Sequence, residues 1–112
     1  MQPPNWIEEF PGAVTVCDTQ GIVLAMNAKA RQSFASGGGA ALIGTNLLDC
    51  HPEPSRTKVA ELLRSGRPNV YTIEKNGVWK LIYQSPWYVE GDYRGLVELA
   101  MEIPAELPHF VR

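Results

Sequence analysis

The order of apolar and polar residues predicts two groups of β-strands with short helices between them. Residues 13–18 (AVTVCD) and 22–26 (IVLAM) are rich in β-branched and other apolar side chains, and the turn-forming sequence TQG at 19–21 separates them. Two short strands around a glycine-containing turn are typical of a β-hairpin. We therefore predict that an antiparallel hairpin begins the folded domain.

A second group of strands is predicted from residue 69 onward. Residues 69–75 and 78–84 flank Asn76–Gly77, the two-residue sequence that most favours a type I′ hairpin, because both of its positions accept a positive φ angle. A longer turn is expected at 90–95, and a last strand at 96–103. These segments predict an antiparallel meander of three strands.

The last of these strands separates apolar from polar side chains by strict alternation. Leu99 and Met101 fall on one face with their apolar neighbours, and Glu98 and Glu102 fall on the other. Two carboxylates act as an acid/base pair only in a concave site, so we predict that this polar face is exposed to solvent. The apolar face is then expected to line the interior of the domain.

The residues between the two groups of strands predict short helices. Asn27 can cap a helix over residues 28–35, and residues 42–50 are expected to form irregular helical turns because Gly44 interrupts them. The best-marked helix covers residues 54–65 and is ended by Gly66. Helices of this kind must cover one face of the sheet, which predicts an α+β domain with its interior between sheet and helices.

The two ends of the chain differ from the predicted domain. Trp6, Ile7 and Phe10 fall on one side of a short helix that Pro11–Gly12 ends. We predict an N-terminal helical cap over residues 1–12, a single domain over 13–103 and an extended tail over 104–112. A chain of 112 residues has room for one such domain.

The order of these segments resembles a PAS domain. The sequence AVTVCDTQGIVLAMNAKARQSF is similar to that family's strand, Asp-x-x-Gly turn, second strand, Asn and helix, and LIGTNLLDCHP resembles its Ile-Gly-x-x-Leu stretch. The SGRP hinge and the strands within QSPWYVEGDYRGLVELAMEI extend the resemblance over residues 10–103. It implies a five-stranded antiparallel sheet in the order 2-1-5-4-3, with short helices packed on one face. It also implies a bacterial sensory module without enzymatic activity.

The resemblance implies a ligand pocket between the sheet and the helices. Its expected lining is apolar with few polar anchors, so side chains alone could also fill it. If a ligand enters, we expect a small carboxylate or an apolar metabolite, with Gln84 among the polar contacts. The predicted lining residues are Phe34, Asn46, Leu47, Leu48, Val59, Leu63, Tyr71, Ile73, Tyr83, Leu99 and Met101.

Cys50 and His51 admit several interpretations. The one we favour has Cys50 packed inward as a small apolar group at the end of a helical turn. Either residue could instead ligate a haem iron, although the PAS family's usual haem histidine lies on the long helix, where this chain has Val59 and Leu62. An exposed redox-active thiol is a third possibility.

Other chemistry is not expected at Cys50 and His51. A nucleophilic cysteine needs a positioned base, and zinc needs three or four ligands, whereas no second Cys/His pair is suitably spaced. We therefore predict no metal site. Flavin is not expected either, because the chain lacks the Asn-Cys-Arg-Phe-Leu-Gln-type motif of the PAS domains that sense blue light.

Large apolar side chains occupy both faces of residues 78–84, with Val78 and Ile82 on one and Trp79 and Tyr83 on the other. A strand that is apolar on both faces needs cover on both. The N-terminal cap or a second copy of the chain could provide it on the outer face. We predict a homodimer that uses Trp6, Ile7, Phe10 and Trp79.

Composition narrows the classes of partner. Ten basic and twelve acidic residues give a net charge of −2 without a basic run, which argues against nucleic acid and anionic membranes. Apolar runs are far shorter than the roughly 20 residues that cross a bilayer, and the first residues do not resemble a signal peptide. Two cysteines are too few for a disulfide framework. We expect a cytoplasmic protein.

The sequence therefore predicts a signalling module that binds a small ligand or cofactor, dimerises and regulates an output domain or partner protein. Three alternatives stay open: a haem-binding gas or redox sensor that uses Cys50 or His51, a small enzyme with the cone-shaped fold of ketosteroid isomerase, and a purely structural dimerisation domain. The enzyme class expects long helices before the sheet and a buried carboxylate, whereas this chain begins with strands.

Overall fold

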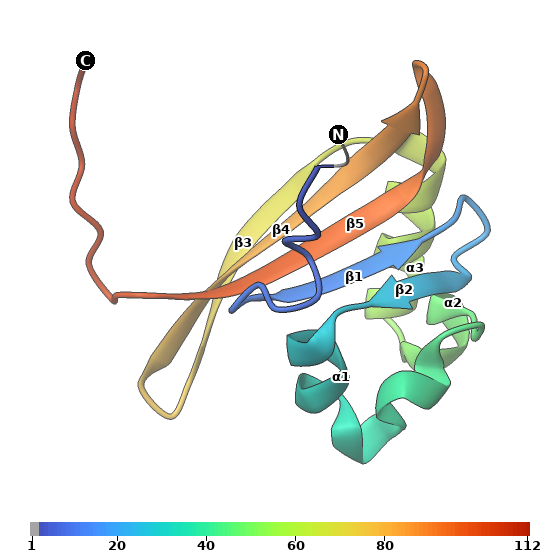
Figure 1. Cartoon of the computed structure of the whole chain (residues 1–112), viewed down its shortest axis with the longest axis horizontal. Coiled ribbons are helices and arrows are strands. Elements are labelled where there is room, and N and C mark those ends of the chain that lie inside the picture. Colours follow the sequence, from blue (N-terminus) through green and yellow to red (C-terminus); the bar gives the residue numbers. More distant parts are fainter. Residues whose placement is uncertain (1–2) are drawn as a thin grey trace.

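The computed structural model describes residues 3–112 and contains a five-stranded antiparallel sheet (Figure 1). Its strands follow the order β2-β1-β5-β4-β3, which confirms the predicted topology. The first hairpin and the later meander thus join in one sheet, with β5 between β1 and β4. The strands are β1 (Ala13–Cys17), β2 (Val23–Met26), β3 (Asn69–Lys75), β4 (Val78–Val89) and β5 (Asp92–Ile103).

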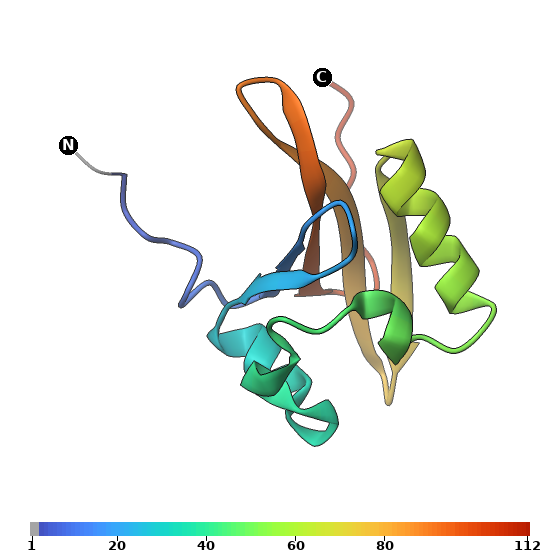
Figure 2. The ribbon, with the colours of Figure 1, turned by 90° about the vertical axis from the view of Figure 1, so that its right-hand side faces the viewer.

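The helices all lie in the chain between β2 and β3. Figure 2 shows α2 and α3 on one side of the sheet and the N-terminal segment on the other. The predicted α+β arrangement, with its interior between sheet and helices, is confirmed. The helical elements are α1 (Ala28–Ser33), the 3-10 turns η1 (Ala35–Gly37) and η2 (Gly39–Leu42), α2 (Leu47–Cys50) and α3 (Ser55–Ser65).

Local sequence signals explain where these helices begin and end. The side chain of Asn27 accepts a hydrogen bond from the Ala30 amide at the start of α1, and Asn46 does the same for Leu48 in α2. Gly66 ends α3 in the left-handed conformation at φ 60°, which glycine adopts without steric cost.

The hairpin turn between β4 and β5 is shorter than predicted. The strands continue to Val89 and resume at Asp92, so that only Glu90 and Gly91 turn the chain, both at positive φ. The expected six-residue turn at 90–95 is wrong because the aromatic residues on either side favour extended backbone.

The predicted N-terminal helical cap does not form within the described residues. Residues 3–12 make a single turn, in which the Phe10 amide donates to the Ile7 carbonyl over 3.3 Å. Prolines at positions 4 and 11 leave too few residues for a helix, and such short helices are unstable without extensive packing. The rings of Trp6 and Phe10 nevertheless pack edge to face, 5.5 Å apart.

The buried apolar residues form two small clusters rather than one filled interior. Leu47 is half-buried and packs against both clusters. Beyond β5, residues 104–112 run away from the sheet (Figure 1). Among residues 3–112, no helix has the length and apolar character needed to span a membrane. The clusters comprise Ala13, Val23, Met26 and Ala30, and Cys17, Leu62, Leu63 and Leu96.

Candidate ligand cavity between the sheet and the helices

A cavity lies between the sheet and the helical layer. It has two adjoining parts with volumes of about 640 and 520 Å³. Sites for small molecules in proteins are typically about 300–1,000 Å³ and mostly apolar, so either part is large enough for a ligand. Both parts are lined by Phe34, His51, Val59, Leu62, Gln84 and Glu98.

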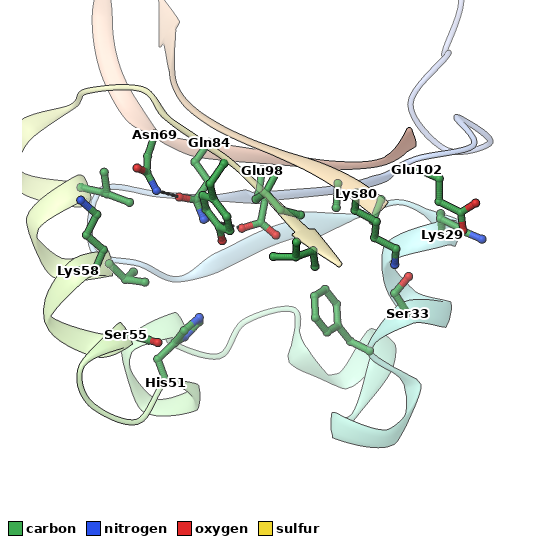
Figure 3. Close-up of a pocket in the computed structure, with 18 of the residues that line it drawn as sticks. Lys29, Ser33, His51, Ser55, Lys58, Asn69, Lys80, Gln84, Glu98 and Glu102 are labelled. Carbon is green, nitrogen blue, oxygen red and sulfur yellow. Dashed lines mark hydrogen bonds between the residues drawn. The ribbon is translucent and has the colours of Figure 1, made fainter. Parts of the chain in front are cut away.

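The sheet side of the cavity carries a row of three polar side chains from three adjacent strands. Strand register places Asn69 of β3 opposite Gln84 of β4, and Gln84 opposite Glu98 of β5. The Asn69 Nδ2 donates to Gln84 Oε1 over 2.8 Å, and the Gln84 Nε2 donates to Glu98 Oε2 over 2.7 Å (Figure 3). The row forms a polar floor beside the smaller part of the cavity, whose other lining residues are mostly apolar.

This row reverses the orientation that we predicted for β5. Glu98 faces the cavity and is half-buried, so the prediction of a solvated acidic face is wrong for Glu98, whereas Glu102 lies at the edge of the cavity and is exposed. Leu99 and Met101 belong to the opposite, outer face, where Phe10 and Met101 both approach Gly12. The outer face is covered there by the N-terminal segment, which makes apolar residues favourable on that side.

A β-bulge explains the reversal. The two-residue turn at Glu90–Gly91 pairs Tyr88 with Tyr93, but a register shift between Trp87 and Tyr88 pairs Trp87 with Gly95. A shift of one residue exchanges the two faces of everything beyond it, because side chains alternate along a strand. Glu98 therefore points into the cavity.

The wall opposite the polar row is formed by α2 and α3. Figure 3 shows His51 and Ser55 on this wall, across the cavity from Gln84 and Glu98. The His51 Nδ1 lies 2.6 Å from the Leu47 carbonyl oxygen, so Nδ1 carries a hydrogen and donates it. In the neutral imidazole this tautomer leaves the Nε2 lone pair available.

The two cysteines occupy different environments. Cys17 is buried at 1% exposure, and burial raises the pKa of its thiol above the ordinary value of 9.0. Cys50 contacts the cavity but is exposed, so the favoured prediction that it packs inward is wrong. The reason is that α2 is a single turn that ends at Cys50 and buries none of its residues.

Five of the predicted lining residues surround the cavity. Tyr71 and Ile73 point inward from β3, and burial together with the nearby charge of Glu98 raises the pKa of the Tyr71 hydroxyl. The Tyr71 side chain is therefore protonated at neutral pH and can donate or accept a hydrogen bond. The five residues are Phe34, Leu47, Val59, Tyr71 and Ile73.

Six predicted lining residues lie outside the cavity wall. The Asn46 side chain is used to cap α2 and to bond the Gln20 carbonyl. Tyr83 lies on the outer face of β4, where it is 40% exposed and pairs with Leu99. The residues that do not line the cavity are Asn46, Leu48, Leu63, Tyr83, Leu99 and Met101.

Sequence reasoning missed Asn69 and Glu98 as cavity residues. The Asn69–Gln84 pair follows from the Asn76–Gly77 turn, because counting outward from that turn places these two residues opposite each other. Glu98 left no comparable signal, since its orientation depends on the bulge. Charged groups at the edge, also missed, include Lys29, Lys58 and Lys80.

The described residues offer no ready-made metal centre. Within residues 3–112, no three His, Cys, Asp or Glu side chains are placed to hold a metal ion together. His51 is the lining residue whose chemistry would suit a haem iron, because its Nδ1 is oriented by a backbone carbonyl as in many metal-binding histidines. Val59 and Leu62 of α3 offer no ligand atom to an iron.

Comparison with known proteins identifies the family to which this fold belongs. The model of the PAS fold family matches residues 7–106. No curated protein matches the sequence. The PAS domain of BvgS from Bordetella pertussis superposes with a TM-score of 0.63 at 18% identity, over 87% of this chain and 80% of that one.

Two further solved structures have the same fold. The PAS domain of an HTR-like protein from Haloarcula marismortui gives a TM-score of 0.62 at 13% identity, covering 88% of this chain and 86% of that one. The Aer2 receptor from Vibrio cholerae, described as a dual PAS-heme oxygen sensor, gives 0.60 at 19% identity, covering 82% and 94%. With its sheet order, its helical layer and the match over most of its length, the chain belongs to the PAS fold family.

Proposed function

We propose that this PAS domain is a sensory module of signal transduction that binds a small molecule between the sheet and α2–α3. The observation that carries the proposal is the cavity itself, which combines a mostly apolar part with the Asn69–Gln84–Glu98 row. A few placed polar groups in an apolar enclosure are what small-molecule sites use for orientation and specificity. PAS membership argues against the ketosteroid-isomerase fold considered above.

In this proposal the bound state is passed to an output domain or a partner protein. Similar structures include the sensor histidine kinase from Vibrio cholerae, which supports a place in such signalling chains. A ligand shifts an equilibrium only if it binds two states of the domain unequally. The polar row and α3 lie on opposite sides of the cavity, so a ligand that contacts both would favour one spacing between them.

The test fills the cavity and leaves the helix intact. Val59→Trp places a large side chain in the cavity from α3, and Glu61→Trp places the same side chain on the exposed side of that helix. Benzyl alcohol is titrated as a neutral probe and followed by the backbone amide spectrum. We expect the probe to shift the amides of Gln84 and Glu98 in the wild type and in Glu61→Trp, but not in Val59→Trp.

Two outcomes contradict ligand binding. Either the probe leaves the cavity amides unchanged in the wild-type chain, or it shifts them equally in Val59→Trp. Native mass spectrometry of freshly purified protein provides an independent readout, since a retained small molecule adds a defined mass that the Val59→Trp variant should lack.

A haem-binding sensor is the second candidate, favoured by the orientation of His51. Haem would supply gas or electron chemistry when bound, and His51 would hold it through the Nε2 atom. Hemin added to the wild-type chain should then give a Soret absorption band that His51→Ala changes. An unchanged hemin spectrum excludes this candidate and leaves the broader proposal in place.

We also propose that the outer face of the sheet forms a homodimer. Trp6 and Ile7 of the N-terminal segment are 56% and 41% exposed, and Val70 and Tyr83 on β3 and β4 are similarly accessible. Phe10 and Trp79 are half-buried on the same side. An exposed apolar surface of this kind is typical of a protein interface.

A further inference from the structure

Glu98, at one end of the polar row, determines which group donates and which accepts in each hydrogen bond of the row. An ionised carboxylate only accepts hydrogen bonds, so the Gln84 amide nitrogen must face Glu98 and the Gln84 carbonyl must face Asn69. This arrangement also determines which oxygen atoms of the row remain free to accept a hydrogen bond from a ligand. Glu98 Oε1 and Asn69 Oδ1 are acceptors, and neither has a hydrogen-bond partner elsewhere in residues 3–112.

The opposite wall offers a third acceptor. Because the His51 Nδ1 donates to the Leu47 carbonyl, the Nε2 atom of the neutral ring can only accept. His51 lies across the cavity from Gln84 and Glu98 (Figure 3). A ligand between the two walls thus meets acceptors on both sides, together with the second N–H of the Asn69 and Gln84 amides and the hydroxyl of Tyr71. N–H or O–H donors of a ligand therefore find partners on both walls.

The larger part of the cavity is lined by three lysines and two glutamates, so the position of each decides which charge a ligand meets. No cationic side chain among residues 3–112 forms a salt bridge with Glu98. Lys80 is the cross-strand neighbour of Glu102, and both lie with Lys29 at the end of the cavity away from Asn69 (Figure 3). Lys58 is an exposed residue at the edge. Glu98 is therefore the charged group in the middle of the cavity.

We propose that the ligand is a small organic cation, an amidine, guanidine or primary ammonium group attached to an apolar body. The cationic nitrogen donates to Glu98, and the apolar body lies against Phe34 and Leu47. This inference rests on the proposed function, because it assigns a ligand class to the same cavity. It replaces the carboxylate or apolar metabolite expected from the sequence.

The experiment compares three probes of the same shape and different charge. Benzamidine, benzyl alcohol and benzoate are titrated into the full chain at constant ionic strength, with the amides of Gln84 and Glu98 as the readout. We expect benzamidine to bind at least tenfold more tightly than benzoate. Charge-assisted hydrogen bonds are about twice as strong as neutral ones, so Glu98→Gln should weaken benzamidine about tenfold or more.

The matched control is Glu102→Gln, which removes the same charge on the same face of β5 two repeats further along the strand. It should change benzamidine affinity less than twofold. The amide spectrum of Glu98→Gln shows whether the fold is intact, since the glutamine can still accept from Gln84.

The outcomes separate this inference from the proposed function. The cationic ligand class is contradicted if benzoate binds as tightly as benzamidine, or if the affinity for benzamidine does not depend on Glu98. In either case, binding of benzyl alcohol in the cavity still supports the proposed function. If none of the three probes shifts the cavity amides, the cation is overturned together with the proposed function.

Discussion

The side chain of Asn27, at 2% exposure, connects three segments of the chain. Its Oδ1 accepts from the amides of Val14 and Ala30, and its Nδ2 donates to the carbonyls of Ile7 and Gly12. The sequence predicted only the bond to α1, because a helix cap is a local signal. The bonds to β1 and to the N-terminal segment depend on tertiary structure and left no pattern.

Replacing this amide should destabilise the whole domain. A buried group left without its hydrogen bond costs about 1–3 kcal/mol, and Asn27→Ala leaves several, so we expect the free energy of unfolding to fall by about 2–4 kcal/mol. Urea denaturation followed by circular dichroism measures it. Asn5→Ala, which removes an exposed side-chain hydrogen bond, should change stability by less than about 0.5 kcal/mol. A loss below about 1 kcal/mol for Asn27→Ala would mean that water replaces the amide.

At the scale of elements, local sequence patterns predicted the positions of the strands and of the longest helix, but not which face of each strand points into the interior. The predicted helix at 54–65 is α3, and the turn at Asn76–Gly77 sets the β3–β4 register as expected. The predicted orientation of β5 was wrong because of the bulge at Gly95. This glycine has φ 142° and packs so closely on the Cys17 carbonyl that a Cβ atom would collide with it. A one-residue shift between strands has no fixed sequence signature.

The attachment of α3 to the sheet involves an ionisable group. The Tyr93 hydroxyl of β5 donates to the Leu63 carbonyl over 2.8 Å near the end of α3, and Gly66 approaches the same ring. Burial is the main cause that raises the pKa of Tyr93 above 10.0, and it raises the pKa of the Cys17 thiol as well. The folded chain therefore holds both protons more tightly than the unfolded chain.

Stability should consequently decrease in alkaline solution. The contribution of these protons is fully present below the ordinary pKa values, near 9 for the thiol and 10 for the phenol, and is lost as pH rises through the raised values. Urea unfolding between about pH 7 and 11 measures the decline. Tyr93→Phe should cost about 1 kcal/mol at neutral pH and give a shallower decline. An unchanged slope in Tyr93→Phe, or an equally shallow one in the exposed Tyr88→Phe control, would contradict the assignment.

At the scale of the whole molecule, the two faces of the sheet have different proposed roles. The inner face encloses the cavity, and the outer face carries the apolar residues of the proposed dimer. The helical cap was predicted from the spacing of Trp6 and Phe10, and their rings do pack together although the backbone forms only a turn. The contact between the Trp6 and Phe10 rings forms although the predicted helix does not, because packing on the sheet does not require a helix.

The dimer predicts a specific effect of Trp6. Large aromatic residues often dominate the affinity of an interface, so Trp6→Ala should weaken self-association about tenfold or more. Sedimentation velocity at tens of micromolar protein measures the dissociation constant. Ile43→Ala removes a side chain of similar exposure, 42%, from the helical layer and should leave the association unchanged. A monomeric wild-type chain under these conditions rules out the proposed interface.

The central position of β5 has a mechanical consequence. This strand carries Glu98 at the cavity and is hydrogen-bonded to β1 as far as Ala100 and to β4 as far as Ile103, where the chain leaves the sheet. Five residues of extended backbone span about 17 Å. A displacement of the Glu98 carboxylate would thus reach residue 104 through continuous extended strand, which stays paired with β4 over its whole length.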